Sequence, residues 1–101
     1  MDANPLADFG AEYEMIIIPV NQLPPGQQVD ARGKLEEALE AALSKSGTGK
    51  VLGGATGLEN AYIDLVLFDA VRSRHVIKSV MAATPYAEHY LTAGFVQASP
   101  R

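Results

Sequence analysis

The chain lacks cysteine and tryptophan, is poor in basic residues and has no long apolar run. Without cysteine, neither a disulfide framework nor a thiolate metal site can form. The longest uninterrupted apolar run, from Met15 to Val20, is too short to cross a bilayer. The start of the chain carries Asp2 and Asp8 with no basic residue beside them, the opposite of a cationic signal peptide. We therefore expect a cytoplasmic protein, bacterial by default, that does not bind membranes.

Basic residues are also too few and too scattered for a nucleic-acid partner. Eight Lys and Arg face twelve Asp and Glu, which gives a net charge of −4. Binding to a phosphate backbone needs clustered cations. Only Arg72, Arg74 and Lys78 lie close together, with His75 among them, and a solvated helix face explains this group. We expect no nucleic-acid partner.

The 101 residues, 48% of them apolar and 20% charged, are typical of one globular domain. We interpret residues 1–101 as a single domain with a loose acidic leader (1–11) and a short tail (97–101). Periodicity predicts strands over 13–20, 50–55, 61–68 and 88–96, the last with a possible bulge at Gly94. It also predicts one helix between an N-cap at Asp30 and a C-terminal Gly47, and another over about 70–83 with Asp69 as its N-cap.

The order β-α-β-β-α-β predicts an α+β, ferredoxin-like sandwich: a four-stranded antiparallel sheet with two helices on one face. In that arrangement the first and third strands lie in the middle of the sheet. Central strands should be the most apolar, and 13–20 and 61–68 are more apolar than the glycine-containing 50–55 or the polar 88–96.

Two helices cover only one face of such a sheet, and the other face should then be unusually apolar. If Ile63 and Leu65 face the helices, the opposite row of the third strand is Tyr62, Asp64, Val66 and Phe68. The first strand is apolar in both rows, so either row leaves apolar side chains beside them; the sequence leaves open which row faces the helices. Such a patch is typical of an interface or a pocket. We expect a homodimer through this face; alternatively, the tail or loops fold over it.

No motif for catalysis, a metal or a cofactor is present. The segment 47–50 (GTGK) resembles the end of a phosphate-binding loop, but Val51 replaces the required Ser or Thr, and a helix precedes the segment instead of following it. If a polar site exists, we expect Asp64, Tyr62 and His89 to form it, because an isolated carboxylate on an apolar strand face needs a partner. No catalytic residue is assigned, and we expect no cofactor and no metal.

The segment 53–58 (GGATGL), followed by 62–65 (YIDL) and Asp69, resembles a pattern in small uncharacterised bacterial ferredoxin-like proteins. The resemblance covers about a quarter of the chain. It implies the fold and often a dimer, and it supplies no catalytic residue.

Three functional hypotheses follow. The first is a non-enzymatic homodimeric module that binds through its open sheet face, with a protein among its partners. The second is a small-molecule-binding domain or cofactor-free enzyme with a site at the same face. In the third, the glycine-containing edge strand adds to the sheet of a partner protein.

Overall fold

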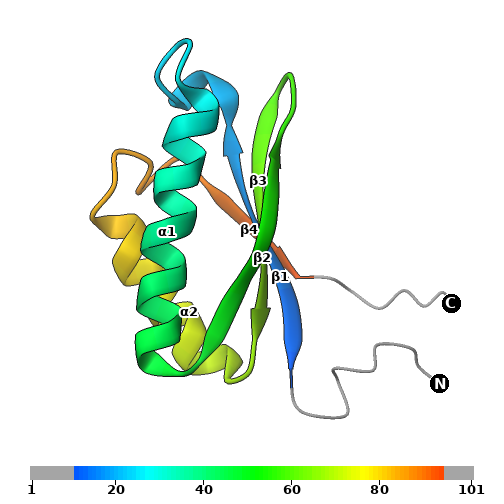
Figure 1. Cartoon of the computed structure of the whole chain (residues 1–101), viewed down its shortest axis with the longest axis vertical. Helices are drawn as coiled ribbons and strands as arrows, with labels where there is room; N and C mark the ends of the chain where they lie inside the picture. Colours follow the sequence, from blue (N-terminus) through cyan, green and yellow to red (C-terminus); the bar gives the residue numbers. More distant parts are fainter. Residues whose placement is uncertain (1–10, 95–101) are drawn as a thin grey trace, which may run out of the picture.

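The computed structural model describes residues 11–94. Apart from Ala11, the predicted leader lies outside the described residues, and so does the predicted tail. The described part consists of one sheet and a layer of helices packed against it (Figure 1).

The sheet has the strand order β2-β3-β1-β4, and every neighbouring pair is antiparallel. Its strands are β1 (Glu12–Pro19), β2 (Gly49–Thr56), β3 (Asn60–Leu67) and β4 (Leu91–Gly94). The two strands with the most apolar sequences are therefore central, as predicted. Pro19, which has no N–H for a ladder, is the last residue of β1.

Helices α1 (Gln28–Ser46) and α2 (Ala70–Ala82) lie on the same side of the sheet (Figure 1). A short 3₁₀ helix, η2 (Val20–Gln22), follows β1. Gly47 ends α1 in the left-handed conformation, with φ 68°. The Asp69 carboxylate accepts a hydrogen bond from the Arg72 backbone N–H at 3.2 Å and caps α2. Both predicted helix signals are thus confirmed.

The predicted start of α1 is wrong. Gln27, not Asp30, is the N-cap residue, and the helix begins at Gln28. The preceding turn explains the difference, because the Gln27 N–H donates to the Pro24 carbonyl and the Gln27 carbonyl then accepts from Ala31. Asp30 instead lies in the first turn, where its negative charge interacts favourably with the positive end of the helix dipole.

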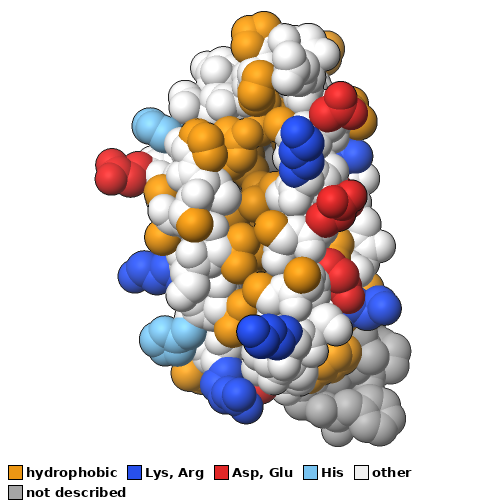
Figure 2. Space-filling model, turned by 60° about the vertical axis from the view of Figure 1, so that its left-hand side comes forward, with side chains coloured by type: hydrophobic (Ala, Val, Ile, Leu, Met, Phe, Trp, Pro, Cys, Tyr) orange, Lys and Arg blue, Asp and Glu red, His pale blue; other side chains and the backbone are white. Residues whose placement is uncertain are grey.

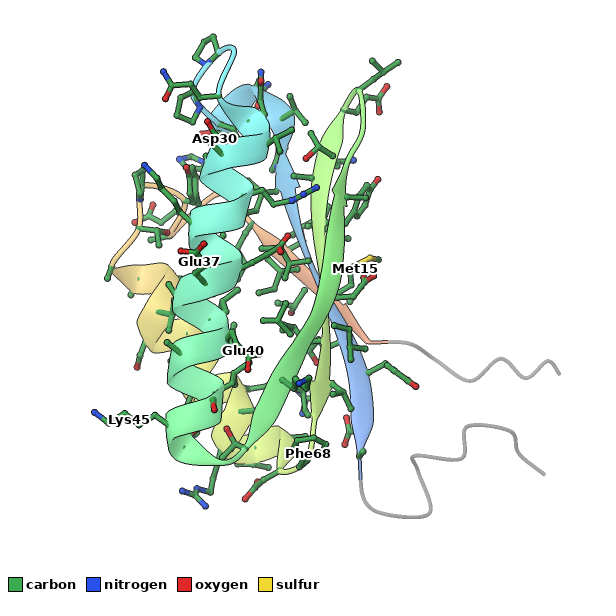
Figure 3. All side chains as sticks on the ribbon, viewed as in Figure 1. Met15, Asp30, Glu37, Glu40, Lys45 and Phe68 are labelled. Carbon is green, nitrogen blue, oxygen red and sulfur yellow. The ribbon has the colours of Figure 1, made fainter. Side chains whose placement is uncertain are left out.

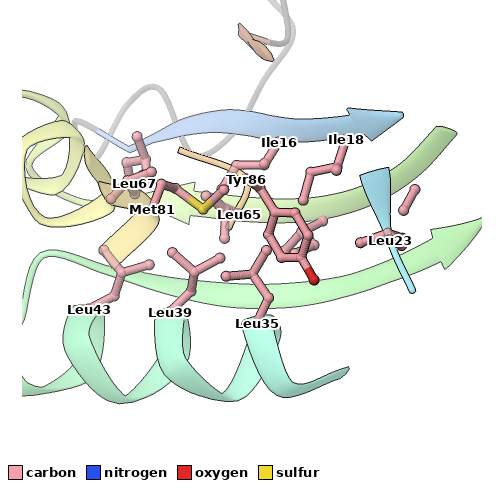
Figure 4. Close-up of a cluster of buried hydrophobic side chains, with 13 residues drawn as sticks. Ile16, Ile18, Leu23, Leu35, Leu39, Leu43, Leu65, Leu67, Met81 and Tyr86 are labelled. Carbon is pink, nitrogen blue, oxygen red and sulfur yellow. The ribbon is translucent and has the colours of Figure 1, made fainter. Parts of the chain in front are cut away.

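The core fills the space between the helices and the sheet (Figure 4). Leu35, Leu39 and Leu43 of α1 are at most 4% exposed, because a spacing of four residues places them on one helix face. Their partners are inward residues of the sheet and of α2: Ile16, Ile18, Ala61, Ile63, Leu65, Leu67, Ile77 and Met81. Burial of each large side chain contributes about 1.5–3 kcal/mol, so this layer dominates the stability.

The last strand begins three residues later than predicted. It begins at Leu91, and residues 95–96 of the predicted range lie outside the described residues. Before it, the chain turns on itself: the Tyr86 N–H donates to Thr84 Oγ1, and the His89 N–H donates to the Tyr86 carbonyl. The Tyr86 ring is buried in the core and anchors the turn (Figure 4). This anchor keeps residues 88–90 out of the strand.

The bulge also lies elsewhere than predicted. The register shifts between Val51 and Gly53 in β2, whereas the pairing of β1 with β4 shows no shift among the described residues. Leu52 is thus the extra residue of β2. Bulges are common on edge strands, where they interrupt regular pairing.

A row of polar side chains from α1 packs against β2. Arg32 Nε lies 2.9 Å from Glu36 Oε2, and Arg32 Nη1 donates to Thr56 Oγ1 at 2.9 Å. Glu40 Oε1 accepts from the Val51 N–H at 2.8 Å. The row rests on Gly54: a Cβ there would clash with the Glu36 carboxylate and lie 2.6 Å from the Tyr62 carbonyl oxygen. Glu36 and Glu40, which the sequence pattern places off the apolar stripe, therefore help to join α1 to the sheet.

The same substitution at two glycines should change stability in opposite directions. Gly54→Ala should lower the free energy of unfolding by about 1–3 kcal/mol, because the new methyl group overpacks the contact between α1 and β2. Gly33→Ala should raise it by up to about 1 kcal/mol, because Gly33 is inside α1 with open space around its Cα. Urea denaturation measures both. Equal effects of the two substitutions would contradict the close approach at Gly54.

Candidate functional site

The sheet face turned away from the helices, here called the open face, is built around the two central strands. Tyr13, Met15 and Ile17 of β1 alternate with the buried Ile16 and Ile18 and so point away from the core. Met15 projects away from the helices in Figure 3. The structure thus settles which row of the first strand is inward.

Strand β3 supplies the matching row. Its inward residues, Ala61, Ile63, Leu65 and Leu67, are at most 1% exposed, as predicted. On the open face the register pairs Tyr13 with Val66, Met15 with Asp64, and Ile17 with Tyr62. Cross-strand neighbours of this kind touch through their side chains. The Asp64 carboxylate therefore lies within an otherwise mostly apolar set.

The edge strands extend this surface. Leu91 and Ala93 of β4 pair with Ile17 and Met15, and Leu91 is 69% exposed. On the other side, Lys50, Gly53 and Ala55 of β2 pair with Val66, Asp64 and Tyr62. Apolar side chains thus run across three neighbouring strands, with Lys50 and Asp64 as the charged groups of these rows.

The predicted site residues lie in three different environments. Tyr62 and Asp64 lie half-buried on the open face, and Val66 lies on it at only 4% exposure, flanked by Tyr13 and Lys50. Phe68 follows the end of β3; it is 52% exposed, and its N–H donates to the Thr48 carbonyl. His89 is exposed in the bend before β4.

The structure therefore brings together Tyr62, Asp64 and Val66 on one face, whereas Phe68 lies just beyond the end of β3 and His89 lies in the bend before β4. Among the described residues, no hydrogen bond or ion pair joins His89 to Tyr62 or Asp64. Sequence reasoning did not single out Tyr13 or Leu91 for this face. The alternation of β1 could have indicated Tyr13. Placing Leu91 on this face required knowing where β4 begins.

On the helix side of the sheet, Arg74 forms ion pairs with two carboxylates of β1. Arg74 of α2 contacts Glu14 Oε1 at 3.0 Å and Glu12 Oε1 at 2.9 Å through Nη2. Hydrogen bonds to Glu14 and, secondarily, to Glu12 raise the pKa of the Arg74 guanidinium above its ordinary value. Glu14 is 4% exposed, so Arg74 neutralises a buried carboxylate. This part of the basic helix face is therefore structural.

The buried hydroxyl groups are structural as well. The Ser73 hydroxyl donates to the Thr48 carbonyl, which also accepts from the N–H groups of Phe68 and Asp69. The Ser46 and Thr48 hydroxyl oxygens lie 2.6 Å apart. These bonds join the end of α1, the start of β2 and the start of α2. The Ser73 hydroxyl donates to a backbone carbonyl and not to a general base, so this hydrogen bond does not activate it as a nucleophile.

The remaining candidates for a site are grooves. One of about 600 Å³ lies between α1 and β2, and one of about 540 Å³ lies between α2 and β4. Figure 2 shows a band of hydrophobic side chains along the helical side of the molecule. Within residues 11–94 there is no group of three or more His, Asp or Glu side chains that could hold a metal ion. Nor is any described helix both long and apolar enough to cross a membrane.

Comparisons with models of protein families, with curated proteins and with solved structures found no match. The residues of this chain are therefore the basis for assigning its function.

The two carboxylates that hold Arg74 should differ in their effect on stability. Glu14→Gln should lower the free energy of unfolding by about 1.5–3 kcal/mol, because it weakens charged hydrogen bonds at a buried position. Glu12→Gln should cost less than about 1 kcal/mol, because the Glu12 side chain is 55% exposed and its ion pair is solvated. Chemical denaturation of both variants measures the difference; equal losses would contradict it.

Proposed function

We propose that this chain is a ferredoxin-like domain that acts as a non-enzymatic homodimeric interaction module, in which two copies pair through their open faces. The strand order β2-β3-β1-β4, with both helices on one side, supports the ferredoxin-like assignment. The dimer accounts for apolar residues at positions where a wet sheet face would carry polar ones.

The observation that carries this proposal is the outward row of β1. Tyr13, Met15 and Ile17 follow one another on the open face of a central strand, next to Tyr62 of β3 and Leu91 of β4. Tyr13, Met15 and Ile17 are half-buried in a single copy, so covering each of them in an interface contributes only part of the roughly 1.5–3 kcal/mol that full burial of an exposed side chain provides. Twofold pairing covers the same patch on both copies at once and is the commonest form of self-association.

The charged groups of the open face fit such a pairing. Asp64 has no hydrogen-bond or ion-pair partner among the described residues, and a carboxylate buried in an interface needs one. Lys50 lies on the same face and is exposed. In the proposed dimer, Lys50 of one copy is the cation that meets Asp64 of the other.

A ligand-binding or enzymatic site formed by Tyr62, Asp64 and His89 has less support. Tyr62 and Asp64 share a face, but His89 lies in the bend before β4. A general base must come within hydrogen-bond reach of the group that it activates. The dimer needs no such convergence, and we therefore prefer it.

Light scattering coupled to size exclusion tests the proposal. The wild-type chain should elute with twice its 10.7 kDa mass, whereas Leu91→Asp and Ile17→Asp should elute as monomers, because each places a carboxylate in the apolar interface. Leu58→Asp is the control, since Leu58 is 99% exposed at the β2–β3 turn. It should remain dimeric.

Circular dichroism confirms that each variant is folded, and the exposure of Leu91 makes its variant the safer of the two. A wild-type chain that is monomeric at a concentration of about 100 μM, well above the dissociation constant of a stable dimer, would overturn the proposal. So would a folded Leu91→Asp variant and a folded Ile17→Asp variant that both remain dimeric.

A further inference from the structure

The groove between α1 and β2 combines a free sheet edge with acidic side chains. Strand β2 is at the end of the described sheet, so no strand formed by residues 11–94 lies beside one side of its backbone. Glu36, Glu37 and Glu40 line the groove from α1, and Val51 and Leu52 line it from β2. A groove between an edge strand and a helix is a common site for extended peptides.

One backbone group of this edge is already held by a side chain. The Val51 N–H donates to Glu40 Oε1 at 2.8 Å, and Glu40 projects from α1 toward the sheet (Figure 3). The carboxylate oxygen thus occupies the position that a carbonyl oxygen of a further strand would take. The bulge leaves the neighbouring Leu52 side chain 51% exposed at the same place.

The charges of the groove indicate what kind of strand fits. Glu36 is paired with Arg32, whereas Glu37 is exposed and has no ion pair within the described residues. If Glu40 leaves the Val51 N–H, it becomes a second unpaired carboxylate facing the groove. Lys50, which pairs with Val66 at the border between this groove and the open face, is the basic residue of the lining. A second copy of this chain would bring like charges together here, so a basic partner is favoured.

We propose that this groove binds a basic, extended segment of a partner protein, which adds to β2 as a further strand. A carbonyl of the segment replaces the Glu40 oxygen on the Val51 N–H. The freed Glu40 and the exposed Glu37 then pair with Lys or Arg side chains of the segment, and Leu52 contacts an apolar residue between them. This inference uses the sheet edge and does not depend on dimerisation through the open face.

Fluorescence anisotropy with the full chain tests this docking. The probes are labelled eight-residue peptides in which Val alternates with Lys or Arg, and the comparison peptides carry Glu at the basic positions. The basic peptides should bind, with affinity that falls as salt is raised. Peptides N-methylated on the residues facing β2 should bind about tenfold more weakly, because they lose backbone donors to the strand.

Two charge-reversal variants distinguish binding at the groove from a general effect of the protein's net charge. Glu37→Lys should weaken binding of the basic peptides about fivefold, because it replaces an ion pair by repulsion. Glu59→Lys makes the same change at an exposed position in the β2–β3 turn, outside the groove lining, and should leave binding nearly unchanged.

Four results would overturn the inference: none of the basic peptides binds, the Glu peptides bind equally well, N-methylation has no effect, or the two charge reversals act alike. If a basic peptide instead dissociates a dimer of this chain, the groove belongs to a second copy, and the proposed partner is wrong.

Discussion

The structure depends on packing a two-helix layer against one face of a sheet whose central strands are apolar on both faces. The inward rows of β1 and β3 meet Leu35, Leu39 and Leu43 of α1 and form the core. This contact fixes the strand order and determines which side chains remain outside. Met15 and Ile17 lie on the open face because Ile16 and Ile18 fill the space under the helices.

Polar contacts around this core set the positions of the elements without contributing its main driving force. Arg74 neutralises the buried Glu14 and ties α2 to β1. Thr48 joins the end of α1 to the start of α2: its N–H donates to the Leu43 carbonyl, and its carbonyl accepts from the Ser73 hydroxyl. The row Arg32, Glu36 and Glu40 ties α1 to β2 across Gly54. Several charged groups that sequence patterns assign to solvent, among them Glu14, Glu36 and Glu40, are used in this way. Within residues 11–94, by contrast, Asp64 on the open face has no hydrogen-bond or ion-pair partner.

Much of the architecture could be predicted because it depends on local patterns. The alternation of β3 predicted its inward row, and the apolar sequences of the first and third strands predicted their central positions. Asp69 and Gly47 marked helix ends because capping involves neighbours in sequence. The start of α1 was missed because a turn at Pro24 through Gln27 begins the helix before Asp30.

Features that depend on distant contacts could not be predicted. The need for glycine at position 54 arises from the Glu36 side chain of α1 and the Tyr62 carbonyl of β3, and no local pattern marks the register shift in β2. His89 was assigned to a strand because nothing local indicates that the Tyr86 ring anchors a turn in the core. The sequence grouped Tyr62, Asp64 and Val66, which share the open face, but it did not single out Leu91, and it placed His89 in the strand whereas His89 lies in the bend before β4.

The accessibility of the Met15 methyl group to a dissolved paramagnetic agent, measured by NMR at increasing protein concentration, tests the central claim most directly. If two copies cover the open face, the methyl signal should relax quickly in dilute solution and become protected as the concentration rises. Protection that is complete at every concentration would mean that the chain covers its own face. Exposure that never changes would mean that the face stays in water, and either result would contradict the account.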